Sequence, residues 1–165
     1  GQFALFTYVR PFLETVTHVS PSGLSLILLT IGIAGFIGTL IVALVLNAAF
    51  YLTLMAIPLL MALIAGVLML TGDSLWIVAL LLGFWGMLAT AAPTSWWTWI
   101  ARTLPEDAEA GGGLMVAVIQ LSIALGSTAG GVVFDTFGWQ STFALSSILL
   151  LSAGVLTFTT SRHRK

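Results

Sequence analysis

Few side chains in this sequence could do chemistry, and those inside its long apolar runs are polar but uncharged. Gln120 is the only amide deep inside such a run, and Thr90, Thr94 and Thr98 follow one another four residues apart. At about 100° per residue, this spacing places the three hydroxyls along one face of a helix. A buried polar group without a hydrogen bond costs on the order of several kcal/mol in lipid, so each must face protein, water or a solute. These residues, with Trp97 at the border of the threonine face, are candidates to contact a polar solute.

Each candidate also has a purely structural interpretation. A threonine hydroxyl can donate back to a carbonyl of its own helix, and Gln120 could form a hydrogen bond between helices. Trp96 and Trp99 lie near the end of an apolar run, where aromatic side chains often mark a membrane interface. Arg10 and Glu14 are one helical turn apart, which suits a local ion pair as well as a role in gating or solute binding.

The composition excludes several other kinds of chemistry. The sequence has no cysteine, and its two histidines lie in charged flanks, so neither thiol catalysis nor a buried metal site is expected. All six carboxylates lie at the ends of apolar runs or between them, whereas a proton relay inside a membrane normally needs a buried acid or histidine. The net charge of -1 gives no basic field for nucleic acid. We therefore expect no enzyme, no cofactor and no metal.

The elements that must position these residues are long apolar runs with charges only at their joints. Of the 165 residues, 59% are hydrophobic and 7% are charged, and a bilayer core about 30 Å thick needs roughly 20 apolar residues per helix. Only helices suit these runs, because open strand edges cannot lie in lipid. The sequence predicts an all-α, polytopic transmembrane bundle in one domain, 1–165. Its spans are expected at about 24–46, 50–70, 75–100, 114–134 and 141–159, after a partial first helix over 1–16 that is interrupted by Pro11.

The basic residues predict an orientation. If the C-terminal tail is cytoplasmic, Arg102 is cytoplasmic as well, because two spans separate them. Four of the five basic residues then lie inside and only Arg10 lies outside, as the positive-inside rule prefers. No cleavable signal peptide is visible, and the first residue, Gly1, indicates either a tag remnant or a cut inside a longer protein.

Small residues recur at helical spacing in two of the expected spans. Such residues let helix backbones approach closely in lipid, so they predict packing faces. The residues are Gly32 and Gly35 in the run 24–46, and Ser122, Gly126 and Gly130 in the run 114–134.

Several segments resemble efflux carriers of the major facilitator superfamily. Residues 6–13 (FTYVRPFL) are similar to the seventh helix of these carriers, and residues 119–135 (IQLSIALGSTAGGVVFD) are similar to the eleventh. Residues 95–99 (SWWTW) fit the end of the tenth helix. The chain looks most like the branch of drug:proton antiporters that exports sugars, sugar-like compounds and purine nucleosides. Many relatives have Asn where Gln120 stands, and the nucleoside exporters are more similar in having Gln.

The resemblance covers the whole chain, as the second half of the family fold, and it implies a missing partner. In such carriers two six-helix halves surround a central cavity, and one half rocks on the other to give alternating access. The eighth and eleventh helices line the seam, which are the spans with the small-residue faces. The N-terminal half, or a second copy of this chain, would complete the carrier, and the N-terminal half would supply a protonatable carboxylate. One departure is the uncharged joint at 45–49 (VLNAA), where the family usually has a basic loop that clamps the cytoplasmic side.

The expected function is therefore half of a proton-coupled efflux carrier for small polar or amphipathic solutes in a bacterial inner membrane. Gln120, the three threonines and Trp97 would contact the solute, with Arg10 near the outer rim. The alternative is a non-transporting membrane scaffold or subunit that binds a partner through its small-residue faces.

Overall fold

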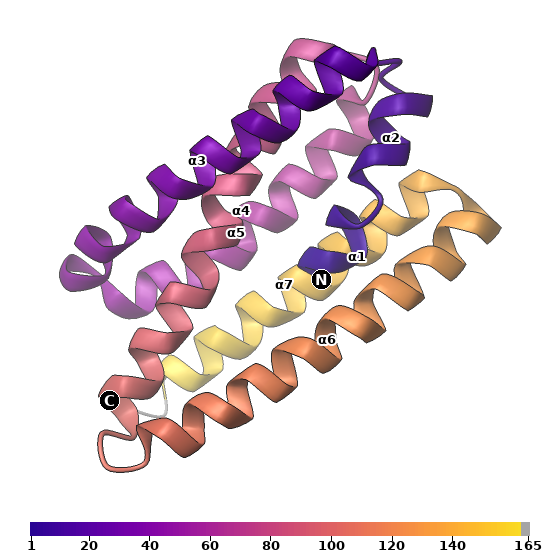
Figure 1. The fold of residues 1–165 in the computed structure, drawn as a ribbon. Helices are drawn as coiled ribbons and strands as arrows, with labels where there is room; N and C mark the ends of the chain where they lie inside the picture. Colours follow the sequence, from indigo (N-terminus) through magenta and orange to yellow (C-terminus); the bar gives the residue numbers. More distant parts are fainter. Residues whose placement is uncertain (163–165) are drawn as a thin grey trace.

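A computed structural model describes residues 1–162 as helices joined by short turns (Figure 1). The predicted all-α bundle is confirmed. The basic residues His163, Arg164 and Lys165 lie outside the described residues. The helices are α1 (Gln2–Phe6), α2 (Val9–Thr15), α3 (Pro21–Ala48), α4 (Phe50–Thr71), α5 (Leu75–Thr103), α6 (Ala108–Phe137) and α7 (Trp139–Arg162).

Five helices, α3 to α7, are long and apolar enough to cross a membrane. Their ends have local causes. The Ser20 hydroxyl accepts a hydrogen bond from the Gly23 N–H (3.2 Å) and Pro21 occupies the first position of α3, a favourable helix start. Gly138 ends α6 at a φ of 85°, which a residue with a side chain rarely adopts.

The predicted partial helix at the N-terminus is broken into α1 and α2 at Thr7 and Tyr8. The break precedes Pro11, which itself lies inside α2. Proline has no N–H, and its ring clashes with the carbonyl four residues earlier, which here belongs to Thr7. Pro11 therefore ends the regular helix one turn before its own position.

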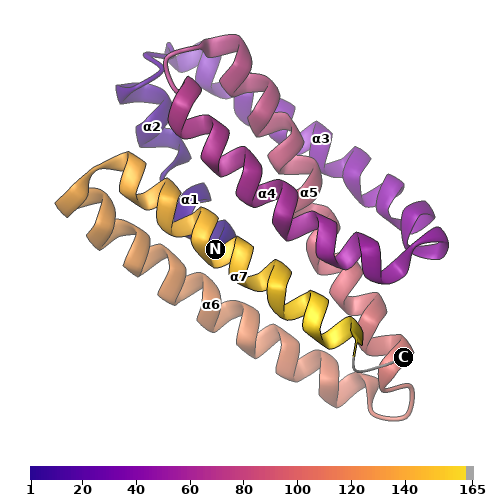
Figure 2. The same cartoon turned by 180° about the vertical axis from the view of Figure 1, so that it is seen from behind.

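The long helices pack mainly as two pairs, α3 with α5 and α4 with α7 (Figures 1 and 2). Glycines allow the first pair to approach closely: Gly38 lies against the Met87 backbone, and a Cβ on Gly86 would stand 2.5 Å from the Ile31 carbonyl oxygen. Phe12 of α2 and Phe143 of α7 are fully buried, with ring centroids 4.8 Å apart.

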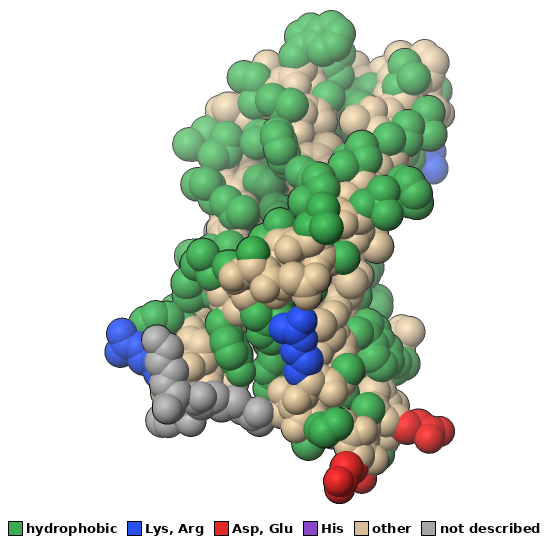
Figure 3. All heavy atoms as spheres, turned by 90° about the vertical axis from the view of Figure 1, so that its left-hand side faces the viewer, with side chains coloured by type: hydrophobic (Ala, Val, Ile, Leu, Met, Phe, Trp, Pro, Cys, Tyr) green, Lys and Arg blue, Asp and Glu red, His purple; other side chains and the backbone are tan. Residues whose placement is uncertain are grey.

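Helix α6 lies at the edge of the bundle. It contacts α1 and α7 and meets α5 only briefly, and only Gly112 and Gly130 of this helix are buried. Large apolar side chains cover much of the surface, and the charged side chains lie toward its ends (Figure 3). An apolar belt with charged ends is the surface that a bilayer requires.

Candidate solute site

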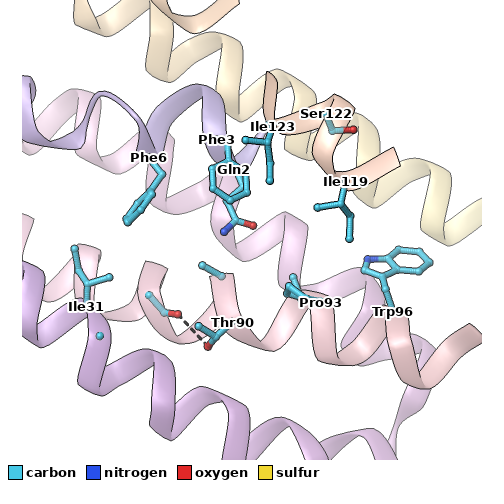
Figure 4. A pocket seen from close by; sticks show the side chains of 15 residues that line it. Gln2, Phe3, Phe6, Ile31, Thr90, Pro93, Trp96, Ile119, Ser122 and Ile123 are labelled. Carbon is cyan, nitrogen blue, oxygen red and sulfur yellow. Dashed lines mark hydrogen bonds between the residues drawn. The ribbon is translucent and has the colours of Figure 1, made fainter. Parts of the chain in front are cut away.

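A cavity of about 700 Å³ opens between α1, α3, α5 and α6 (Figure 4). This volume lies within the range of small-molecule sites, roughly 300 to 1,000 Å³. The lining residues are Gly1, Gln2, Phe3, Phe6, Ile31, Gly32, Gly86, Ala89, Thr90, Ala92, Pro93, Trp96, Ile119, Ser122 and Ile123.

Small residues on two helices leave this space open. Helix α5 contributes Gly86, Ala89 and Ala92 to the wall, and α3 contributes Gly32, whose Cβ position has no atom within 4 Å. Because these residues have little or no side chain, α3 and α5 can pack closely without filling the space in front of α6.

The wall combines aromatic rings with a few polar groups. Gln2, Phe3 and Phe6 point from α1 toward α5, and Trp96 of α5 stands opposite Ile119 (Figure 4). The polar side chains are those of Gln2, Thr90 and Ser122. An apolar cavity with a few convergent polar groups suits a solute that has a flat apolar ring and polar substituents.

Of the three threonines, only Thr90 lies in the cavity wall. Its hydroxyl donates to the Gly35 carbonyl of α3 (2.7 Å), which ties α5 to α3. The hydroxyls of Thr94 and Thr98 donate back within α5, to the carbonyls of Thr90 (3.3 Å) and Thr94 (2.8 Å). For these two residues the structure shows the purely structural arrangement.

The other polar candidates lie outside the cavity lining. Gln120 is exposed on α6, beside the lining residue Ile119. Trp97 packs against Gly112, where a Cβ would stand 2.6 Å from the indole ring. Arg10 is exposed on α2, and its Nε donates to Oε1 of Glu14 at 2.9 Å, the local ion pair considered above.

The small-residue candidates divide into two groups. Gly35 faces Thr90 of α5, while Gly126 and Gly130 lie against the backbone of Phe3 and Ala4 in α1, so these three glycines meet helices of this chain. Gly32 and Ser122 face the cavity instead.

A polar cluster that the sequence did not reveal lies where α1 breaks. The Tyr8 hydroxyl donates to the Ser127 carbonyl (2.7 Å), and the Thr7 and Ser127 hydroxyls are 2.9 Å apart. The Tyr8 ring stacks on Phe134 with centroids 5.2 Å apart. These contacts fasten the irregular backbone of α1 and α2 to α6.

This cluster gives a stability prediction. Tyr8→Phe keeps the ring stack but removes the hydrogen bond to Ser127, so the free energy of unfolding should fall by about 1 kcal/mol. Thermal unfolding of the full-length protein in detergent would measure the change. Tyr51→Phe is the matched control, because the Tyr51 hydroxyl has no hydrogen-bond partner among the described residues; equal melting temperatures would contradict the prediction.

Gln2, Phe3 and Phe6 were also missed as site residues. They belong to a helix of only five residues, too short for a periodic face to be read from the sequence. An amide at the start of an apolar run was the one available signal.

Comparison with known proteins identifies the class. The family model of the Major Facilitator Superfamily matches residues 1–165, and the chain belongs to this superfamily. The family and the five apolar helices make it an integral membrane protein, and the predicted resemblance is confirmed.

Individual relatives are similar over nearly the whole chain. It is 62% identical over 164 residues to the "Transcription regulatory protein OpdE" of Pseudomonas aeruginosa, covering 99% of this chain and 41% of that protein. It is 42% identical over 151 residues to the "Purine ribonucleoside efflux pump NepI" of Salmonella enteritidis and of Salmonella typhimurium, covering 92% of this chain and 38% of each pump. The chain thus spans less than half the length of these relatives. No solved structure matches it.

Proposed function

We propose that this chain forms one half of a proton-coupled efflux carrier for small amphipathic solutes, with purine ribonucleosides as the class to test first. The observation that carries the proposal is the cavity of about 700 Å³ with its aromatic and polar wall. Similarity to a purine ribonucleoside efflux pump supports the substrate class.

The wall has the groups that such a solute needs. A purine ring can stack on Phe3, Phe6 or Trp96, and the Gln2 amide can both donate to and accept from the edge of the base. Ser122 offers a hydroxyl for the sugar. Hydrogen bonds of this kind gain strength in a cavity of low dielectric constant, so a few polar groups suffice for selectivity.

A second six-helix half is the proposed partner. It would close the open side of the cavity and pack on α6, whose surface is almost wholly exposed. It would also supply the proton-binding carboxylate, because all six carboxylates of this chain lie near helix ends or in the α5–α6 loop. A second copy of this chain is the alternative partner. Rocking of the two halves would give alternating access, with the C-terminus in the cytoplasm.

A regulatory membrane subunit is the second candidate function. The 62% identical relative carries the name of a transcription regulatory protein, which favours this candidate. In such a role the chain would bind a partner through α6 and the solute cavity would serve sensing or nothing.

Transport by the full-length protein in proteoliposomes distinguishes the two candidates. A carrier should accumulate labelled purine ribonucleosides when a pH gradient is imposed and should stop when an ionophore dissipates the gradient. Binding of nucleoside without accumulation under any gradient would reject the carrier and favour the regulatory subunit.

Two glutamine variants test which amide contacts the solute. Gln2→Ala should raise the apparent KM about tenfold, because it removes hydrogen bonds inside the cavity. Gln120→Ala should alter KM or selectivity only if the second half brings a solute to the exposed face of α6. Measuring uptake of several nucleosides by each variant compares them directly. Unchanged kinetics in both would remove the amides from the site.

A further inference from the structure

A second hollow lies on the side of the bundle formed by α3, α4 and α5. It is a groove of about 320 Å³, and its wall includes Ile41, Val45, Leu52, Ala56, Leu60 and Met87. The hydroxyl of Thr53, the single polar side chain of this wall, donates to the Ala49 carbonyl at 2.8 Å. The groove is therefore apolar throughout.

The groove opens onto the surface that faces lipid. Its rim residues Ile41, Leu52 and Leu60 are 44%, 60% and 46% exposed. In an integral membrane protein, the molecules available to an apolar groove on this surface are lipid acyl chains. No helix of the chain covers it.

A cation stands at one end of this groove. Arg102, in the last turn of α5, places its guanidinium 4.6 Å above the ring of Phe50 and donates from Nη2 to Oδ1 of Asn47 at 3.2 Å. Phe50 begins α4 between Ala49 and Leu52, both of which belong to the groove wall or its mouth. Arg102 thus sits where α3 joins α4, at the joint that lacks a charge of its own.

The charge of Arg102 is not balanced by an acid. Among residues 1–162 the one ion pair is Arg10 with Glu14, and both partners of Arg102 are neutral. The acids of the α5–α6 loop lie beyond ion-pair distance, and Figure 3 shows acidic side chains apart from the basic ones at this end. A guanidinium has five N–H donors, and Asn47 accepts from one, so a planar set remains for the oxygens of a phosphate.

The distance between cation and groove fits one lipid leaflet. Ala91 of the groove wall and Arg102 are eleven residues apart on α5, which is three turns and about 16 Å along the same face. Half of a hydrocarbon core about 30 Å thick has nearly this depth. A phosphate at Arg102 would therefore lie at the membrane surface while an acyl chain of the same molecule filled the groove.

We propose that this face binds one anionic phospholipid, with its phosphate on Arg102 and one acyl chain in the groove of α3, α4 and α5. The site is independent of the solute cavity, which opens between other helix faces. The bound lipid would join the ends of the three helices where the joint carries no basic residue.

Native mass spectrometry of the full-length protein, with phosphatidylglycerol and phosphatidylcholine added in equal amounts, tests the proposal. The wild type should retain one phosphatidylglycerol in preference, and Arg102→Gln should lower its affinity about fivefold. Arg102→Lys should recover part of the preference, and Ala56→Phe, which fills the groove, should weaken both lipids. Arg10→Gln, at an exposed arginine outside the groove, is the matched control and should behave as the wild type.

Three results would overturn the proposal. Equal retention of the two lipids by the wild type would indicate annular lipid only. Equal losses in Arg102→Gln and Arg10→Gln would show a general charge effect, and displacement of the lipid by millimolar inorganic phosphate would show an anion site without an acyl chain. Melting temperatures without added lipid confirm that each variant is folded, and none of these readouts depends on transport.

Discussion

Gly38→Ala is expected to unfold the protein or to lower its free energy of unfolding by about 3 kcal/mol or more. A Cβ at this position would overlap the backbone carbonyl of Met87, and a backbone atom cannot rotate away as a side chain can. The α3–α5 pair, one of the two main helix pairs of the bundle, would have to separate. In lipid this pair is held by close packing, so the separation is not offset by a hydrophobic gain.

Gly66→Ala is the matched control for this prediction. Gly66 is also inside a long helix, but no atom lies within 4 Å of its Cβ position. Alanine favours the helix over glycine by about 1 kcal/mol, so this variant should be neutral or more stable. Size-exclusion profiles and melting temperatures of the two full-length variants in detergent measure the contrast. Similar stability in both variants would show that the α3–α5 contact is not tight.

Trp96→Ala is expected to weaken solute binding more than any other substitution in the cavity. Trp96 presents the largest ring in the wall, and losing a stacked aromatic partner should cost about 2 kcal/mol, or roughly thirtyfold in affinity. Trp96→Phe keeps an aromatic surface and should lose much less. Binding of labelled nucleoside to the purified full-length protein measures both affinities.

The control for this variant is Trp76→Ala, since Trp76 is 83% exposed on α5 and does not line the cavity. It should bind as the wild type does. If Trp96→Ala binds normally while its melting temperature drops, Trp96 supports the fold and does not contact the solute.

Some features could be read from the sequence because they depend on local composition. Apolar runs of about 20 residues become helices in lipid whatever surrounds them, since no other structure satisfies their backbone. The joints were equally predictable, because Ser20, Pro21 and Gly138 act through their own backbone preferences. Pro11 predicted an interruption, which the structure places one turn earlier, at Thr7.

The solute site was only partly predictable. The sequence indicated Thr90, Thr94 and Thr98 alike, because they share one helical face. Thr90 alone meets the cavity, where Gly35 of α3 offers a carbonyl, and its neighbours bond within their own helix. Gln2 enters the wall because α1 is held between α6 and α7, and the sequence of five residues carries no sign of that.

The sequence by itself determined the class of protein, the helices and the absence of charge within them, because each follows from the free energy of placing a short segment in lipid. Tertiary structure alone decided which small residues became contacts and which became empty space. Gly35 and Gly130 touch other helices, whereas Gly32, of the same residue type, lines a cavity. The difference depends on the position of the neighbouring helix, which is fixed by packing between residues far apart in the chain.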